Sequence, residues 1–325
     1  MGQTADGPGS GVSVSPETRS EAFGDRLADR VAERGSQIVL GIDPDPARLW
    51  PQALELTETR SGHTPAQLAG RAVAAHCRLL LDAAGDQCVA IKPQVACFER
   101  LGAPGWSALA GLVRDASERG LLVIADAKRG DIDISARAYG QAFFGSTATP
   151  FGEVPGLGAD LLTVSPLLGR DSLMPLVDAA RAVGAGLLVL TRTSNPGAAD
   201  IQDRVLQSGE AVSDLIAGIV DELGRPAIGA RGLSDVGAVT GATAPEHLER
   251  LRARMPAAVM LLPGIGPQGA SGRGLAPAFA PGPAGGLVAA SRAIVHAHER
   301  DGGDPAAGAR REAQRLRELI WDLYS

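Results

Sequence analysis

The sequence of 325 residues predicts an α/β protein with the (β/α)8 fold, the TIM barrel. Two observations support this prediction: short apolar runs alternate with segments of helical periodicity, and eight such alternations follow one another along the chain. Parallel strands joined by helical crossovers give this pattern, and eight of them close into a barrel. An open, doubly wound sheet is the alternative, but the first apolar run lacks the G-x-G-x-x-G turn of a dinucleotide-binding fold.

Strands are expected where short apolar runs lie between turn residues, and helices where apolar residues recur with helical spacing. The expected strands are residues 37–43, 88–94, 121–127, 159–165, 186–192, 227–231, 258–263 and 285–290. The expected helices are residues 66–84, 106–119, 171–183, 209–223, 245–255 and, against the barrel wall, about 306–323.

The chain is expected to form one catalytic domain over residues 21–325, preceded by a flexible tail over residues 1–20. The tail is rich in Gly, Ser, Thr and acidic residues and lacks the apolar core of a signal peptide. Only one strand and one helix follow the Gly- and Pro-rich residues 264–286, too little for a second core. That segment is therefore expected to be a long mobile loop on the active face.

Composition narrows the classes of partner. The net charge is −6 and the sequence contains no run of Lys or Arg, which argues against a nucleic-acid partner and favours a small molecule. The three cysteines show no C-x-x-C spacing, so a reduced, cytoplasmic setting is expected, without a zinc site or a disulfide framework. No apolar stretch approaches the roughly 20 residues that span a bilayer, so no membrane association is expected.

Three successive predicted strands end in charged residues, at Asp43, at Lys92 and in the segment Asp126–Asp131. Side chains alternate between the two faces of a strand, so Asp126 and Lys128 are expected to share one face. A single charge at such a place is typically a helix cap or a solvated loop residue. Three in succession predict a site, because catalytic side chains gather at the carboxyl ends of barrel strands.

Residues near the last two strands indicate phosphate binding. The Gly-rich segment 261–269 follows the seventh strand, and Arg292 follows the eighth. Backbone N–H groups of such a loop and a guanidinium beside it suit a phosphate monoester. After the fifth strand, residues 193–197 offer hydroxyls and an amide that can read a planar ligand, although on the residues alone an Asx or Ser turn without a ligand is favoured.

The segment 124–132, Ile-Ala-Asp-Ala-Lys-Arg-Gly-Asp-Ile, resembles the D-x-K-x-x-D signature of orotidine 5'-monophosphate decarboxylase, the last enzyme of de novo UMP synthesis. The resemblance extends over nearly the whole chain from about residue 36. Its other elements, in the order of the family, are Asp43, Lys92, residues 193–197, residues 263–268 and Arg292. The N-terminal tail and an insertion around residues 57–65 are similar to the longer bacterial branch of the family.

This resemblance implies decarboxylation of orotidine 5'-monophosphate to UMP and CO2 without a metal or other cofactor. Lys128 would be the cationic general acid that protonates C6 as CO2 leaves, and Asp126 would lie against the substrate carboxylate. Asp131 would reach into the site of a partner subunit, so the active unit would be a homodimer with two composite active sites. Asp133 is instead expected to be a charge in the first turn of a helix.

The same resemblance assigns the parts of the substrate to the remaining residues. Lys92 would complete the charge array and touch the ribose, whose hydroxyls Asp43 would bind. Ser194 would hydrogen-bond the pyrimidine, and Ser135 would contact it from the partner side. The phosphate would be held by Gln268 and Arg292, with Arg273 as a weaker possible addition.

Elementary chemistry agrees with these roles, because decarboxylation leaves an electron pair on a ring carbon and the barrier must fall through preorganised charges. Three alternatives stay open. A Schiff-base aldolase would use Lys92 or Lys128 as nucleophile, but flanking aspartates favour a protonated Lys128. A sugar-phosphate decarboxylase on this barrel would need Mg²⁺, yet none of the five histidines lies at a predicted strand end and no clustered carboxylate set is present. A catalytically silent barrel that senses UMP is the third.

Overall fold

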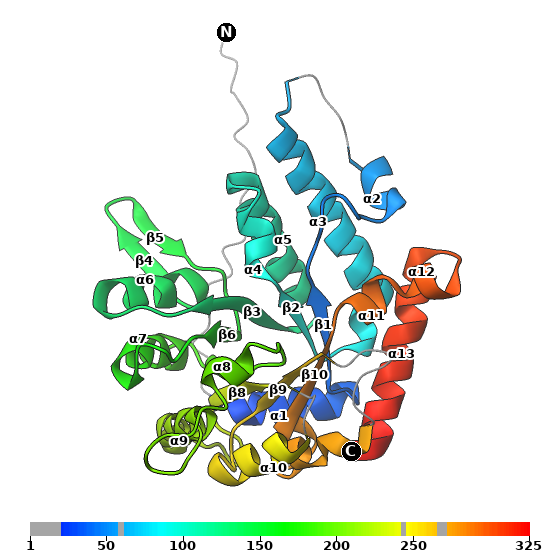
Figure 1. Ribbon diagram of the computed structural model, residues 1–325. Coiled ribbons are helices and arrows are strands. Elements are labelled where there is room, and N and C mark those ends of the chain that lie inside the picture. Colours follow the sequence, from blue (N-terminus) through cyan, green and yellow to red (C-terminus); the bar gives the residue numbers. More distant parts are fainter. Residues whose placement is uncertain (1–20, 58–61, 242–244, 265–271) are drawn as a thin grey trace.

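The computed structural model describes residues 21–57, 62–241, 245–264 and 272–325. In it, eight parallel strands follow one another around a closed barrel in chain order, and helices surround them (Figure 1). The predicted (β/α)8 fold is confirmed. The barrel strands are β1 (Ile38–Ile42), β2 (Ala90–Pro93), β3 (Leu122–Arg129), β6 (Leu161–Val164), β7 (Gly186–Arg192), β8 (Val236–Thr240), β9 (Met260–Pro263) and β10 (Gly286–Ala290).

The helices pack around the strands and hold them apart from solvent. Capping residues define the ends of the two longest helices: Thr64 and Gln67 form a reciprocal capping box at the start of α3, and Asp304 caps α13. The α-helices are α1 (Phe23–Arg34), α2 (Pro51–Glu55), α3 (Pro65–Ala84), α4 (Val95–Glu99), α5 (Ala103–Glu118), α6 (Asp133–Phe143), α7 (Arg170–Arg181), α8 (Ala198–Ile201), α9 (Val212–Gly224), α10 (Pro245–Arg254), α11 (Arg292–Val295), α12 (Ala297–Asp301) and α13 (Pro305–Tyr324). The 3-10 turns are η1 (Gly85–Gln87), η2 (Arg225–Ala227), η3 (Gly272–Phe279) and η4 (Pro283–Gly285). Within the described residues, every helix is too short or too polar to cross a membrane.

The sixth strand was predicted at residues 227–231, and this is wrong: the strand is β8, which begins at Val236. The apolar patch at 227–231 is short, and its backbone is occupied elsewhere. The N–H groups of Ala230 and Arg231 donate to the carboxylate of Asp25 at 2.9 and 2.6 Å. A segment whose donors bind a side chain cannot supply them to a neighbouring strand.

Helix α1 was not anticipated, and it closes the end of the barrel at which the strands begin. Phe23, Leu27 and Val31 of this helix are buried in one cluster with side chains of the barrel interior. An ion pair from Arg26 to Asp160, with N and O 2.7 Å apart, fixes the helix to the turn before β6. The apolar face of α1 therefore forms the floor of the barrel.

A two-stranded antiparallel hairpin was also not anticipated. It consists of β4 (Ser146–Thr149) and β5 (Gly152–Pro155), and it projects from the barrel beside α6 (Figure 1). Phe151 at its tip is fully exposed. The hairpin thus extends the face of the molecule that carries α6.

Candidate active site

The end of the barrel opposite α1 holds a buried carboxylate between two lysines. Asp126 of β3 is 6% exposed, and its Oδ2 atom lies 2.7 Å from Nζ of Lys92 on β2. The ammonium group of Lys128 pairs with the other oxygen, Oδ1. Asp126 and Lys128 were expected to share one face of a regular strand; their side chains are in contact, but the strand is irregular at Lys128. Two cations around one anion leave this part of the site positively charged.

An irregularity in β3 aims Lys128 at Asp126. The pairing of β3 with β6 shifts register between Ala125 and Arg129, and Lys128 has a φ of 48°, in the left-handed region. This conformation costs a non-glycine residue about 1 kcal/mol. Thr163 of β6 holds it in place: its hydroxyl accepts from the Lys128 N–H at 3.0 Å and donates to Asp126 Oδ1 at 2.9 Å. Strain retained beside a charge cluster is typical of a functional site.

The surroundings of Asp126 favour its ionised form. Burial alone raises the pKa of this carboxyl group, but the charges of Lys92 and Lys128 and their hydrogen bonds outweigh burial and lower the pKa below its ordinary value. The Gln94 amide adds a further hydrogen bond at 3.2 Å. Asp126 is therefore an anion at neutral pH.

A cavity of about 510 Å³ adjoins this cluster. Lys92 forms part of its wall, so the cavity and the charge cluster share a residue. Its other charged and hydroxyl-bearing lining residues come from the ends of different strands: Asp43, Ser194, Ser291, Arg292 and, on α12, Arg300. The volume is of the size of sites that enclose a small organic ligand.

The structure brings together many of the residues that the sequence singled out. Asp43, Lys92, Ser194 and Arg292 line one cavity although 249 positions separate the first from the last along the chain. Asp43 follows β1, and Arg292 is the first residue of α11, directly after β10 and Ser291. The cavity is therefore lined by one carboxylate, by hydroxyl groups and by three cationic side chains, Lys92, Arg292 and Arg300.

Two predicted residues are not among the described residues that line this cavity. Asp131 follows β3, and its Oδ1 atom accepts a hydrogen bond from the Ile132 N–H at 2.8 Å. Ser135 is exposed on α6. Asp133 starts this helix, as expected. Gln268 and the tail of residues 1–20 lie outside the described residues, as do the side chain of Arg273 and most of the Gly-rich loop before it.

Three residues of the site were missed in the sequence. Thr163 and Gln94 contact Asp126, and both follow or end an apolar strand run, so the rule that identified Lys92 also applies to them. Arg300 belongs to the short helix α12, and nothing in its local sequence indicates that it lines the cavity.

Comparison with known proteins agrees with this geometry. The model of the orotidine 5'-phosphate decarboxylase / HUMPS family matches residues 36–303. The chain belongs to this family. The resemblance seen in the sequence is thereby confirmed, and with it the prediction of an enzyme of the carboxy-lyase class.

Individual members of the orotidine 5'-phosphate decarboxylase / HUMPS family are similar over most of their length. The orotidine 5'-phosphate decarboxylase of Rhodopirellula baltica is 39% identical over 281 residues, which are 86% of this chain and 90% of that protein. The orotidine 5'-phosphate decarboxylase of Deinococcus radiodurans is 38% identical over 298 residues, 90% of this chain and 93% of that protein. The solved structure of Leishmania donovani OMP decarboxylase has a TM-score of 0.64 at 30% identity and covers 91% of this chain and 99% of that one.

Proposed function

We propose that this protein decarboxylates orotidine 5'-monophosphate to UMP and CO2, the final step of pyrimidine nucleotide synthesis. The observation that carries the proposal is the buried Asp126 carboxylate between Lys92 and Lys128, beside a cavity that Lys92 and Arg292 both line. Membership of the family supports the same reaction. Lysine, aspartate and arginine side chains alone supply the charges, so the proposed chemistry needs no metal or organic cofactor.

In the proposed reaction, the bond between C6 and the carboxylate carbon breaks and its electron pair remains on C6 while CO2 leaves. The ammonium of Lys128 then gives C6 a proton, and the lysine regains one from water. Asp126 holds the ammonium in place before the charge on C6 develops, so no reorganisation is needed during the reaction. Lys92, on the opposite oxygen of Asp126, keeps that carboxylate ionised and reaches the ribose from the cavity wall.

The remaining cavity residues bind the parts of the substrate that do not react. Asp43 accepts hydrogen bonds from the ribose hydroxyls, and Ser194 bonds the polar edge of the pyrimidine. Arg292 binds the phosphate as a planar fork of donors, and Arg300 adds a second guanidinium to the same cavity. Gln268 is proposed as a further phosphate ligand from the sequence alone.

The active unit is proposed to be a homodimer in which Asp131 and Ser135 complete the partner's site. Exposure supports this: Ile132 and Ile134, which lie next to Asp131 and Ser135 in the chain, are 50% and 77% exposed. Apolar side chains of this kind beside a polar rim are typical of a surface that another subunit covers. Each site would then contain Lys128 from one chain and Asp131 from the other.

The direct test is the loss of ultraviolet absorbance of orotidine 5'-monophosphate in buffer with EDTA. We expect stoichiometric conversion to UMP at an unchanged rate when EDTA is added. A rate that falls with EDTA and returns with Mg²⁺ would point to a metal-dependent decarboxylase, and trapping of a carbonyl substrate by borohydride would point to an aldolase. Binding of UMP without any turnover would leave a nucleotide-binding barrel.

A further inference from the structure

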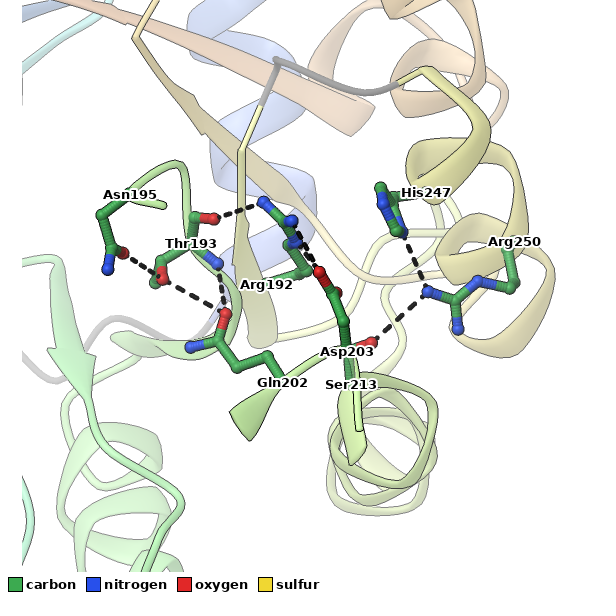
Figure 2. Close-up of polar contacts among 8 residues, drawn as sticks. All are labelled: Arg192, Thr193, Asn195, Gln202, Asp203, Ser213, His247 and Arg250. Atoms are coloured by element: carbon green, nitrogen blue, oxygen red, sulfur yellow. Dashed lines mark hydrogen bonds and ion pairs between the residues drawn. The ribbon is translucent and has the colours of Figure 1, made fainter. Parts of the chain in front are cut away.

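Ser194 lines the cavity, and the residue before it, Thr193, is hydrogen-bonded by residues of the segment that follows in the chain (Figure 2). The Thr193 N–H donates to Oε1 of Gln202 at 2.7 Å. The Thr193 hydroxyl lies 3.2 Å from the same oxygen and 2.6 Å from Oδ1 of Asn195, so two acceptors share one proton. Gln202 thus fixes the peptide between Arg192 and Thr193, one peptide before the one that leads into Ser194.

A second contact fixes the other side of the same residue. The guanidinium of Arg192 donates from Nη1 to the Thr193 carbonyl at 2.8 Å, and its Nε and Nη2 atoms bind Asp203 at 3.2 and 2.8 Å. The hydrogen bond from Arg192 lowers the pKa of Asp203. The N–H and the carbonyl of Thr193 are therefore both held by the consecutive residues Gln202 and Asp203, the latter through Arg192.

Two glycines lie close to Ser194. The Gly241 N–H donates to the Arg192 carbonyl at 2.6 Å, and a Cβ atom at Gly241 would lie only 2.9 Å from Cα of Ser194. A Cβ atom at Gly264 would lie 3.8 Å from Cβ of the same serine, in ordinary contact. Two glycines therefore lie against Ser194, which is itself exposed, and Gln202 and Asp203 hold the residues before it, Thr193 and Arg192.

The holding segment is itself anchored to the barrel wall. The Gln202 N–H donates to the Ala198 carbonyl at 2.7 Å, and the Gln202 carbonyl accepts from the Ser213 N–H, at the start of α9, at 2.8 Å. Other side chains of this segment face solvent, among them Ile201 and Val205. These side chains of the segment contribute little to the core. The hydrogen bonds of the segment to Thr193 are therefore what links it to the site.

We propose that Gln202 is a positioning residue for recognition of the pyrimidine. It positions the Ser194 hydroxyl for its hydrogen bond to the pyrimidine. The proposed contacts of Asp43 with the ribose and of Arg292 with the phosphate do not depend on it. This inference rests on the proposed function. It predicts that loss of the Gln202 acceptor weakens binding of the base and spares binding of the sugar phosphate.

The test compares two ligands on three variants of the full chain. Gln202→Met removes the acceptor and keeps the size of the side chain, Gln202→Glu restores an acceptor, and Gln207→Met makes the same change as the first at an exposed position of the same segment. UMP and ribose 5-phosphate are titrated calorimetrically or used as competitive inhibitors. Gln202→Met should raise the dissociation constant of UMP about tenfold, as expected for one lost hydrogen bond to a backbone donor, and leave that of ribose 5-phosphate unchanged.

The dissociation constant of UMP for Gln202→Glu should lie within about twofold of that for the unaltered chain. Gln207→Met should have the same dissociation constant as the unaltered chain. Equal weakening of both ligands by Gln202→Met, or no weakening of either, would overturn the positioning role. Failure of the proposed function looks different, because the unaltered chain itself would then not decarboxylate orotidine 5'-monophosphate.

Discussion

The two ends of this barrel are built from the same strands, yet one is apolar and sealed and the other is charged and open. At the sealed end Leu27 of α1 packs with interior side chains such as Leu161. On β6 the next interior position, Thr163, already bonds to Asp126. On β3 the change is equally abrupt, from the buried Ile124 to the ionised Asp126. Every second residue of a strand points into the barrel. Two consecutive interior positions of one strand can therefore belong to the apolar floor and to the charged site.

This division has an energetic reason. Burial of apolar side chains at the sealed end contributes free energy of folding, about 25 cal/mol for each Å² removed from water. The buried ion pairs at the open end contribute little, because desolvation of the charges offsets most of their attraction. Lys128 is 45% exposed, and Asp126 keeps Lys92 as a partner when Lys128 is removed, so substitution of Lys128 should change catalysis more than stability. Substitutions at the sealed end should do the reverse.

The largest effect is expected for Lys128→Ala. Loss of the proton donor should lower kcat about 10⁴-fold, while UMP binding remains measurable because cavity residues such as Arg292 are unchanged. Steady-state turnover and calorimetry with UMP check the two parts. A modest loss of rate, or unfolding of the variant at 25 °C, would contradict the division between the two ends.

At the sealed end, Leu27→Ala should lower the free energy of unfolding by about 3 kcal/mol, because Leu27 is fully buried and its removal leaves a cavity. The kcat per folded molecule should stay the same. Leu54→Ala is the matched control, since Leu54 is 55% exposed on α2 and its truncation should cost little. Urea unfolding followed by circular dichroism measures both, and a large loss of kcat in Leu27→Ala would show that the floor of the barrel also shapes the site.

A smaller effect is expected on the stability of the fold at acidic pH, and it should come from a histidine at the open end. His76 lines a cavity beside Asp43 and Arg292, and it accepts a hydrogen bond from the Trp50 N–H. Burial, with a minor contribution from His296, lowers the pKa of His76 from 6.5 to about 4. Since the unfolded chain binds this proton at higher pH than the folded one, stability should fall as pH drops from about 6.5 to 4.

Between pH 7 and pH 5 this histidine should account for about 2 kcal/mol of lost stability. In His76→Asn, which keeps an acceptor for Trp50 and cannot titrate in this range, the loss between the two pH values should be smaller by that amount. Urea unfolding at both pH values gives the comparison. An equal pH dependence in the variant and the unaltered chain would assign the acid sensitivity to other groups.

The sequence predicted the parts of the fold that local patterns determine. The apolar run along residues 121–127 identified β3, because strand patterns are local, whereas the contact of Lys128 with Asp126 also depends on the irregularity at Lys128. The sixth strand was misplaced because backbone N–H groups within residues 227–231 bind the carboxylate of Asp25, about 200 positions earlier in the chain. Helix α1 escaped prediction for a similar reason, as its function as a floor depends on the closed barrel.

For the site, residues at strand ends could be predicted, but their supports could not. Lys92 and Arg292 each follow an apolar run, a visible local signal. The hydrogen bond from Thr163 to Asp126 depends on the pairing of two strands. The hydrogen bond between Thr193 and Gln202 depends on how an exposed segment folds back onto the barrel. The place of Thr163 near a strand end is a local signal, but the partners of these hydrogen bonds cannot be predicted from a single sequence.

The most direct test of the proposed site is a mixed dimer of two inactive variants, Lys128→Ala and Asp131→Ala, co-expressed with different tags and purified on both. If each site takes Lys128 from one chain and Asp131 from the other, one of the two sites in the mixed dimer is intact, and we expect about half of the wild-type turnover. Turnover no higher than that of the two parent variants, or a protein that remains monomeric, would contradict a site shared between two chains.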